Sequence, residues 1–334
     1  MPERATVQQQ SQVGVEADPW GGNVAAPTIL PATSITPGIK TDMTTFRAVG
    51  KKYPTVVAQN KEWVEAAIAG QMSYADLTFL LAGIICDPSS GVYDTNGFTH
   101  TYHLNPAAVD TIKTFSVEIG DPGTYGAVLL ASEFSYGLIR DLTLEFSRAG
   151  CTVSGAMLGK GYTDLAATMT AGTALASVPV QPTEVCVYMD TSLGGIGGTK
   201  LSRCLSASLA LSNRFAPMYV LDSAYPGFVA HVETAPDFTV KIKVEADSTG
   251  MGPLALLRLG STRWFQIKAI STTIAGATLP YDLTIQFAAK FNAMSDFSDE
   301  EGVYAVEYTA VCTPELTTSY PLLVVLHNKV SDVV

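Results

Sequence analysis

The stretch Phe238-Thr239-Val240-Lys241-Ile242-Lys243-Val244-Glu245 decides the class of fold. Its apolar residues alternate strictly with polar or charged ones. A period of two is typical of a β-strand that buries one face and exposes the other. Because antiparallel sheets commonly have one buried and one solvated face, the stretch predicts an antiparallel sheet.

The same period recurs along most of the chain after about residue 110. It is clear at 115–119 and 141–147, and further strands are expected at 185–187, 205–211, 264–270, 281–288, 303–311 and 321–327. This pattern predicts a mainly β fold: an antiparallel β-sandwich with one or two short flanking helices and extended N- and C-terminal arms.

Three segments carry helix signals instead. Asn60 is a candidate N-cap with Gly70 placed to end a helix. Ser73 and Asp76 resemble a capping box before apolar residues at helical spacing, with Gly83 at the end. Residues 253–260 fit one more short helix.

Residues 1–60 differ from the rest because proline and glycine recur throughout. Such spacing forbids a helix and interrupts a central strand. Val7, Val13, Val15 and Val24 make the region too apolar for a free linker. We expect an extended arm that lies on neighbouring subunits; a disordered terminus is the alternative.

These patterns divide the chain into four parts. They are an extended N-terminal arm (1–60), a short helical and loop segment (61–104), a β-sandwich domain (105–312) and a C-terminal strand or arm (313–334). A faint internal echo, Leu138-Ile139-Arg140-Asp141-Leu142 against Leu201-Ser202-Arg203-Cys204-Leu205, weakly favours two equivalent hairpins within the β-domain.

Composition limits the function. The 334 residues include 20 basic and 31 acidic side chains, a net charge of −11, which argues against a protein that grips nucleic-acid phosphates. Charged residues make up only 15%, against about 25% in ordinary soluble domains. A surface so poor in charge predicts extensive burial against other copies.

Targeting and redox signals are weak. The polar N-terminus has no apolar core for a signal peptide, and the longest apolar run, 77–86, is about half a membrane span. The five cysteines are far apart without C-x-x-C, so we expect small buried hydrophobes in a reducing cytoplasm.

The sequence offers no convincing catalytic or metal site. The run 194–198 lacks the Lys-Ser/Thr of a phosphate loop and predicts a hairpin loop. His100 and His103 lack a third ligand nearby. The acidic run 296–301 could hold a cation, although a solvated turn is preferred. We predict a non-enzyme with no cofactor and no metal.

Several motifs resemble major tail tube proteins of long, non-contractile-tailed bacteriophages. They are Gln12-Val13-Gly14-Val15-Glu16, Gly194-Gly195-Ile196-Gly197-Gly198-Thr199-Lys200-Leu201, Asn213-Arg214-Phe215, His231-Val232-Glu233 through Glu245, and Phe297-Ser298-Asp299-Glu300-Glu301-Gly302. The resemblance covers about residues 105–320 and the arm, and it carries over no catalytic residue.

This resemblance implies a virion-tail subunit assembled in the host bacterial cytoplasm. Six copies would form a ring, and stacked rings would conduct the genome. The implied partners are further copies of the chain and the tail terminator, tape measure and distal tail proteins, with no membrane. Genomic DNA would pass without specific binding. Four strands per copy would close about 24 strands into a barrel on the order of 45 Å across.

An acidic wall would repel the phosphates that slide past it. Glu118, Asp141 and Glu145 are the candidate lumen-facing residues, because each lies on the polar side of an alternating strand. Two alternatives stay open: another structural virion β-protein, of the distal tail or a capsid decoration, and a β-sandwich carbohydrate-binding module or glycosidase.

Overall fold

The computed structural model describes residues 10–17, 21, 22, 24–120, 130–222, 226–313 and 321–333. Within them the chain is mainly β, with two α-helices, α1 (Asp76–Ile84) and α2 (Gly252–Leu259). The strands are β1 (Gln10–Val15), β2 (Thr28–Ile29), β3 (Thr33–Phe46), β4 (Val56–Gln71), β5 (Ser89–Asp94), β6 (Gly97–His103), β7 (Phe115–Gly120), β8 (Leu130–Ser147), β9 (Gly150–Thr168), β10 (Thr173–Ala174), β11 (Val185–Asp190), β12 (Cys204–Ser212), β13 (Phe215–Met218), β14 (Ala230–Glu233), β15 (Asp237–Glu245), β16 (Thr262–Thr273), β17 (Pro280–Met294), β18 (Ser298–Glu300), β19 (Val303–Cys312) and β20 (Leu322–Asn328).

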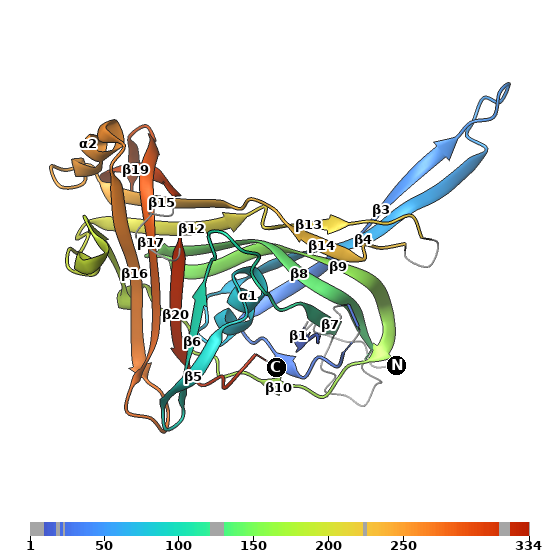
Figure 1. The fold of residues 1–334 in the computed structure, drawn as a ribbon, viewed down its shortest axis with the longest axis horizontal. Coiled ribbons are helices and arrows are strands. Elements are labelled where there is room, and N and C mark those ends of the chain that lie inside the picture. The colour runs from blue at the N-terminus through green and yellow to red at the C-terminus, as the bar shows by residue number, and fades with distance from the viewer. Residues whose placement is uncertain are drawn as a thin grey trace.

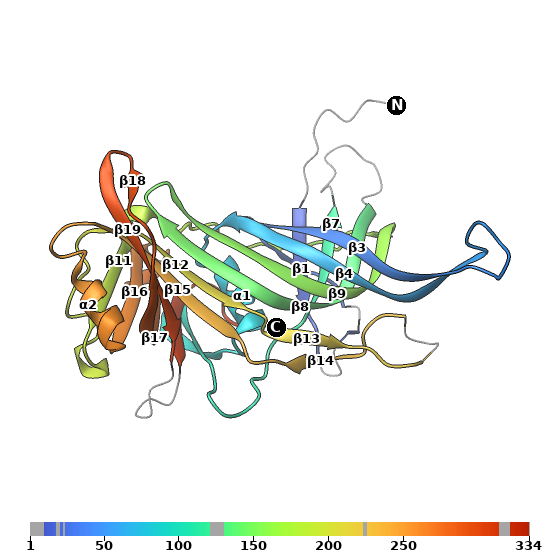
Figure 2. The same cartoon turned by 90° about the horizontal axis from the view of Figure 1, so that it is seen from above.

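Eight long strands form one continuous antiparallel layer. Their order is β3-β4-β9-β8-β12-β15-β19-β17, and every neighbouring pair is antiparallel. Figures 1 and 2 show β4, β9, β8, β12 and β15 running side by side across the molecule. The alternating pattern of 238–245 is confirmed as β15, with Phe238, Val240, Ile242 and Val244 buried.

A second group of strands crosses the end of this layer. It has the order β11-β16-β17-β20-β6-β5, so β17 belongs to both groups. The core lies where the apolar sides meet, with Leu144 and Val240 from the long layer and Ile267 and Val324 from the second group. Helix α1 is buried at every position, as expected for a helix that is apolar almost all round.

The topology repeats within the chain. The first half runs β3, β4, α1, β7, β8, β9 and the second runs β12, β15, α2, β16, β17, β19. The long strands of each half pair in the same order, since β9 lies between β4 and β8 and β19 lies between β15 and β17. Helix α1 contacts β8 and α2 contacts β17, which is the equivalent strand. The chain therefore contains two copies of one β-β-α-β-β-β unit.

The sequence echo does not mark this repeat. Leu138–Leu142 lie in β8, whereas Leu201–Leu205 lead into β12. Strand β8 corresponds to β17 and β12 corresponds to β3, so the echoing segments occupy different places in the two units. Two equivalent halves exist, but the L-x-R-x-L match is coincidental.

The helix expected between Asn60 and Gly70 is wrong. These residues belong to β4, where Val64, Ala66 and Ile68 are buried while Glu65 and Ala67 are exposed. Pairing with β3 on one side and β9 on the other satisfies the backbone, which overrides the local capping signals. The helices expected at 73–83 and 253–260 are confirmed as α1 and α2.

The expectation of an arm over residues 1–60 is wrong for most of its length. Residues 33–46 form β3, a strand of the long layer, and Pro37 is tolerated because β3 lies at the edge of that layer. Residues 10–15 form β1, which pairs along its length with β7 of the same chain.

Candidate assembly surfaces

The long layer has one buried face and one open face, which we call the polar face. A row of paired residues crosses all eight strands on it: Ser34, Ala69, Ser154, Thr143, Ala210, Thr239, Val311 and Lys290. None of these side chains is buried. Seven of these eight side chains are uncharged, and no described part of the chain covers this face.

Two of the three predicted lumen residues lie on the polar face. Glu145 is exposed on β8, opposite Thr152 and Ser208 on the neighbouring strands. Asp141 pairs with Arg140 at 2.8 Å and accepts a hydrogen bond from the Asn213 amide.

Most other carboxylates on this face are also paired with cations. The pairs are Lys241 with Glu307, Arg203 with Glu245, Lys243 with Glu300 and Lys40 with Glu65. Within the described residues Glu145 has no ion pair. The face is therefore of mixed charge with a free carboxylate near its middle, and not uniformly acidic.

The prediction for Glu118 is wrong. Its strand, β7, is buried at all six positions, so alternation there does not separate core from solvent. The carboxylate accepts hydrogen bonds from the Ala26 and Thr170 amides and the Thr170 hydroxyl. Such a satisfied interior carboxylate holds the N-terminal segment in place and cannot face a channel.

Three of the four valines expected to contact neighbouring subunits pack onto their own chain. Val13 is 2% exposed and lies opposite Val117 in the β1–β7 pair. Val15 packs partly buried against the same core, and the Val24 amide donates to Ser116 Oγ at 3.0 Å. Val7 lies outside the described residues. The described residues between 10 and 30 are thus part of the fold of one chain.

The outer part of the β3–β4 hairpin extends well beyond the rest of the molecule (Figures 1 and 2). We call residues 40–63 the projection, because β4 pairs with β9 only from Val64 onward. Its apolar side chains are open: Phe46 is 60% exposed and Tyr53 70% exposed, and Met43, Val49, Val56 and Val57 are exposed too. Contiguous exposed apolar surface marks an interaction site.

The second half carries the equivalent hairpin, β13–β14 with the described part of its connecting loop (215–222 and 226–233), which we call the docked hairpin. It leaves the layer between β12 and β15, as the projection leaves it between β3 and β4. Unlike the outer part of the projection, it packs against the first half of its own chain, including Trp63 at the base of the projection. Phe228 meets Tyr136 edge to face at 5.0 Å, and Tyr219 meets Trp63 at 6.5 Å.

A buried arginine fixes the base of the docked hairpin. Arg214 is 2% exposed and bonds Asp110 of the first half at 2.5 Å and Glu233 of the hairpin. Its guanidinium also donates to the carbonyl oxygens of Ile84 and Ile85 at the end of α1. This cluster joins the two halves through fully engaged charged groups.

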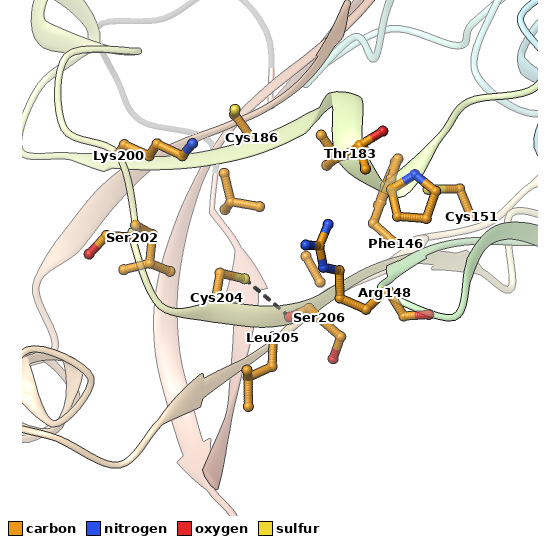
Figure 3. Close-up of a pocket in the computed structure, with 16 residues that line it drawn as sticks. Phe146, Arg148, Cys151, Thr183, Cys186, Lys200, Ser202, Cys204, Leu205 and Ser206 are labelled. Carbon is orange, nitrogen blue, oxygen red and sulfur yellow. Dashed lines mark hydrogen bonds between the residues drawn. The ribbon is translucent and has the colours of Figure 1, made fainter. Parts of the chain in front are cut away.

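A cavity of about 420 Å³ opens between β8, β11 and β12 (Figure 3). Arg148 and Lys200 provide its charges, and its lining contains no carboxylate or imidazole. Burial raises the pKa of the Cys151 thiol to about 11 and that of Cys204 to about 12, and Cys204 donates to the Ser206 carbonyl. Protonated thiols without a base supply neither a nucleophile nor a thiolate ligand.

The histidine and acidic motifs that were considered as metal sites have structural roles. The ring of His100 is buried between Ser90 Oγ and the Val330 carbonyl. The predicted turn between two strands is present only at Glu301 and Gly302, where Glu301 has a positive φ, because Asp299 and Glu300 of the acidic run belong to β18. The described part of the chain holds no group of three or more residues suited to a metal ion.

Neither α1 nor α2, the two α-helices of the described residues, is long and apolar enough to cross a membrane. No protein-family model matches the chain, and no curated protein matches its sequence.

Proposed function

We propose that this protein is a structural subunit of a bacteriophage tail tube, which self-associates into rings that stack into a conduit for DNA. The observation that carries the proposal is the eight-stranded layer, with one face in the core and one open face of short side chains. An open sheet with unpaired edges invites further strands, and closing it into a barrel removes the edges.

The composition of the polar face suits the passage of DNA rather than its binding. Hydroxyl and methyl groups offer few strong contacts to phosphate, and the paired charges leave little excess positive potential. The chain as a whole carries −11. A wall of this kind does not release DNA counterions, so a sliding duplex is not retained.

The described cavities support a structural role more than a catalytic one. Glycoside hydrolysis needs two carboxyl groups facing each other across a cleft. The described lining of the cavity beside β8, β11 and β12 lacks carboxylates, and the carboxylates of Asp110 and Glu233 are both engaged by Arg214.

Electron microscopy of the purified chain at high concentration tests the proposal. We expect rings or short tubes with a central channel, and the same protein should be present in virion tails. A chain that stays monomeric by light scattering and is absent from tails contradicts the proposal.

A charge variant tests the assignment of the polar face to the channel. Glu145→Lys adds one cation per copy to the wall, and each new phosphate contact contributes a slope of roughly −0.9 in log affinity against log salt. We expect normal tails with slow, salt-sensitive DNA ejection. Glu145→Gln is the matched control, because it removes the carboxylate without adding a cation. Wild-type ejection by Glu145→Lys at low and high salt contradicts the assignment.

A further inference from the structure

The junction between the two halves of one chain offers a template for the junction between copies. Inside the chain, β8 at the edge of the first unit pairs with β12 at the edge of the second, from Leu142 opposite Leu211 to Ser147 opposite Ser206. The two outer edges of the long layer are β17, equivalent to β8, and β3, equivalent to β12. The outer edges are therefore the two sides of the same junction. The β3 edge has fewer available donors than β12, because Pro37 has no N–H and the Ile35 N–H donates to Ser11 Oγ at 3.0 Å.

The directions of the free edges allow this pairing. All seven neighbouring pairs in the layer are antiparallel, so the strands at its two ends, β3 and β17, run in opposite directions. When β3 of one copy is placed beside β17 of the next, the antiparallel alternation continues. The outer side of β17 is open beyond Lys290, where its pairing with β16 ends.

At the internal junction, the pairing of β8 with β12 is accompanied by a second contact, which the docked hairpin makes. Across the internal junction it lies near the start of the paired part of β4 and the end of the paired part of β9. There Glu62 N–H donates to the Pro226 carbonyl at 3.1 Å, and Phe215 and Phe228 cluster with Leu158. The equivalent place in the second unit is the start of β15 and the end of β19.

A cavity of about 480 Å³ occupies that equivalent place. Pro236 and Phe238 line it at the start of β15, and Cys312 lines it at the end of β19. Ala235 lies exposed beside it. In the first unit the corresponding site is covered by the docked hairpin, whereas here no described part of the chain fills it.

We infer that the projection of one copy docks over this cavity on the next copy while its β3 pairs with the neighbour's β17. Phe46 and Tyr53 would serve as the aromatic anchors, as Tyr219 and Phe228 do within the chain. The occupant is a second copy of this chain because the projection is the only described hairpin with the same topological origin as the docked one. The inference rests on the proposed function.

A ring of three copies follows from the strand count. Each chain contributes eight strands, twice the four expected from the sequence, so three copies give 24 strands and a barrel on the order of 45 Å across. Two copies would give a barrel on the order of 30 Å, too narrow for duplex DNA between side chains. Six would give one on the order of 90 Å. Three copies thus present six equivalent units around the channel.

Cysteine cross-linking tests the docking and the count together. Tyr53→Cys and Ala235→Cys are combined in a Cys312→Ala background, which removes the native thiol from the cavity. The assembled protein is oxidised and run on a denaturing gel, with each single-cysteine variant as its control. We expect a ladder that ends at three copies and is absent from both controls.

Other outcomes overturn separate parts of the inference. A ladder that ends at six copies refutes the count of three. Wild-type rings without cross-linking in the double variant refute the docking of the projection on this cavity, provided that the variant itself still forms rings. If the wild-type chain forms no rings at all, the proposed function fails instead.

Discussion

The docked hairpin and the projection come from equivalent places in the two halves of the molecule, yet their surroundings differ. The docked hairpin buries Phe215 and Phe228 against the first half and anchors itself through Arg214. The projection leaves Phe46 and Tyr53 open. Two hairpins with the same topological origin therefore differ in their environment. One packs its aromatic side chains against its own chain, and the other leaves them exposed to solvent.

The largest effect on stability is expected at the base of the docked hairpin. Arg214→Ala leaves Asp110 and Glu233 buried without their cation, which costs about 3–5 kcal/mol. Urea unfolding should show a much lower midpoint than the wild type. Arg203→Ala, which removes an exposed ion pair with Glu245, is the control and should change little. Equal effects of the two variants would refute the anchoring role.

A slightly smaller loss is expected from the aromatic contact. Phe228→Ala empties a site that is 1% exposed, which costs about 3 kcal/mol. Its counterpart Phe46→Ala should change monomer stability by less than about 0.5 kcal/mol, because that side chain is 60% exposed. Phe46→Ala should nevertheless weaken assembly. Similar unfolding losses in both variants would break the contrast between the two hairpins.

Acidification should loosen the docked hairpin. Burial lowers the pKa of His231, whose ring bonds the Tyr136 hydroxyl at 3.1 Å. The unfolded chain, with a histidine pKa of about 6.5, therefore takes up a proton at a pH where the folded chain does not. Stability contributed by this group is intact above about pH 6.5 and falls as the pH drops toward the folded pKa.

Hydrogen exchange measures this effect of pH on the docked hairpin. Amides of β13 and β14 should exchange faster at pH 5.5 than at pH 7.5, after correction for intrinsic rates, and His231→Gln should reduce the difference. The exposed projection serves as the internal reference. Unchanged protection of β13 and β14 across this range would contradict the prediction. His100 and His327 also have pKa values lowered by burial, so global stability should fall in the same direction.

The sequence predicted the strands that have one buried and one open face. Apolar and polar residues alternate in segments such as 141–147 and 238–245, because successive side chains of these strands point to the core and to the polar face in turn. The same alternation gave a wrong prediction for Glu118. Strand β7 is buried on both sides, and its polar residues form hydrogen bonds inside the protein.

The projection could not be read from periodicity. Residues 41–45 are exposed on both sides, so no face imposes a pattern on them. The repeat was hidden for a related reason: equivalent strands share their pairing and not their side chains, as the misplaced L-x-R-x-L echo shows. The valines of the N-terminal region were expected to lie against a protein surface, and the described ones do. Their apolar character does not say whether that surface belongs to the same chain or to a neighbour.

Rotational averaging of end-on images of the assembled protein tests the central claim most directly. We expect a closed ring with a central channel, three-fold symmetry between copies and an approximate six-fold repeat of density around the wall. A ring with six whole copies, or a preparation with no ring at a concentration where tails assemble, would contradict it.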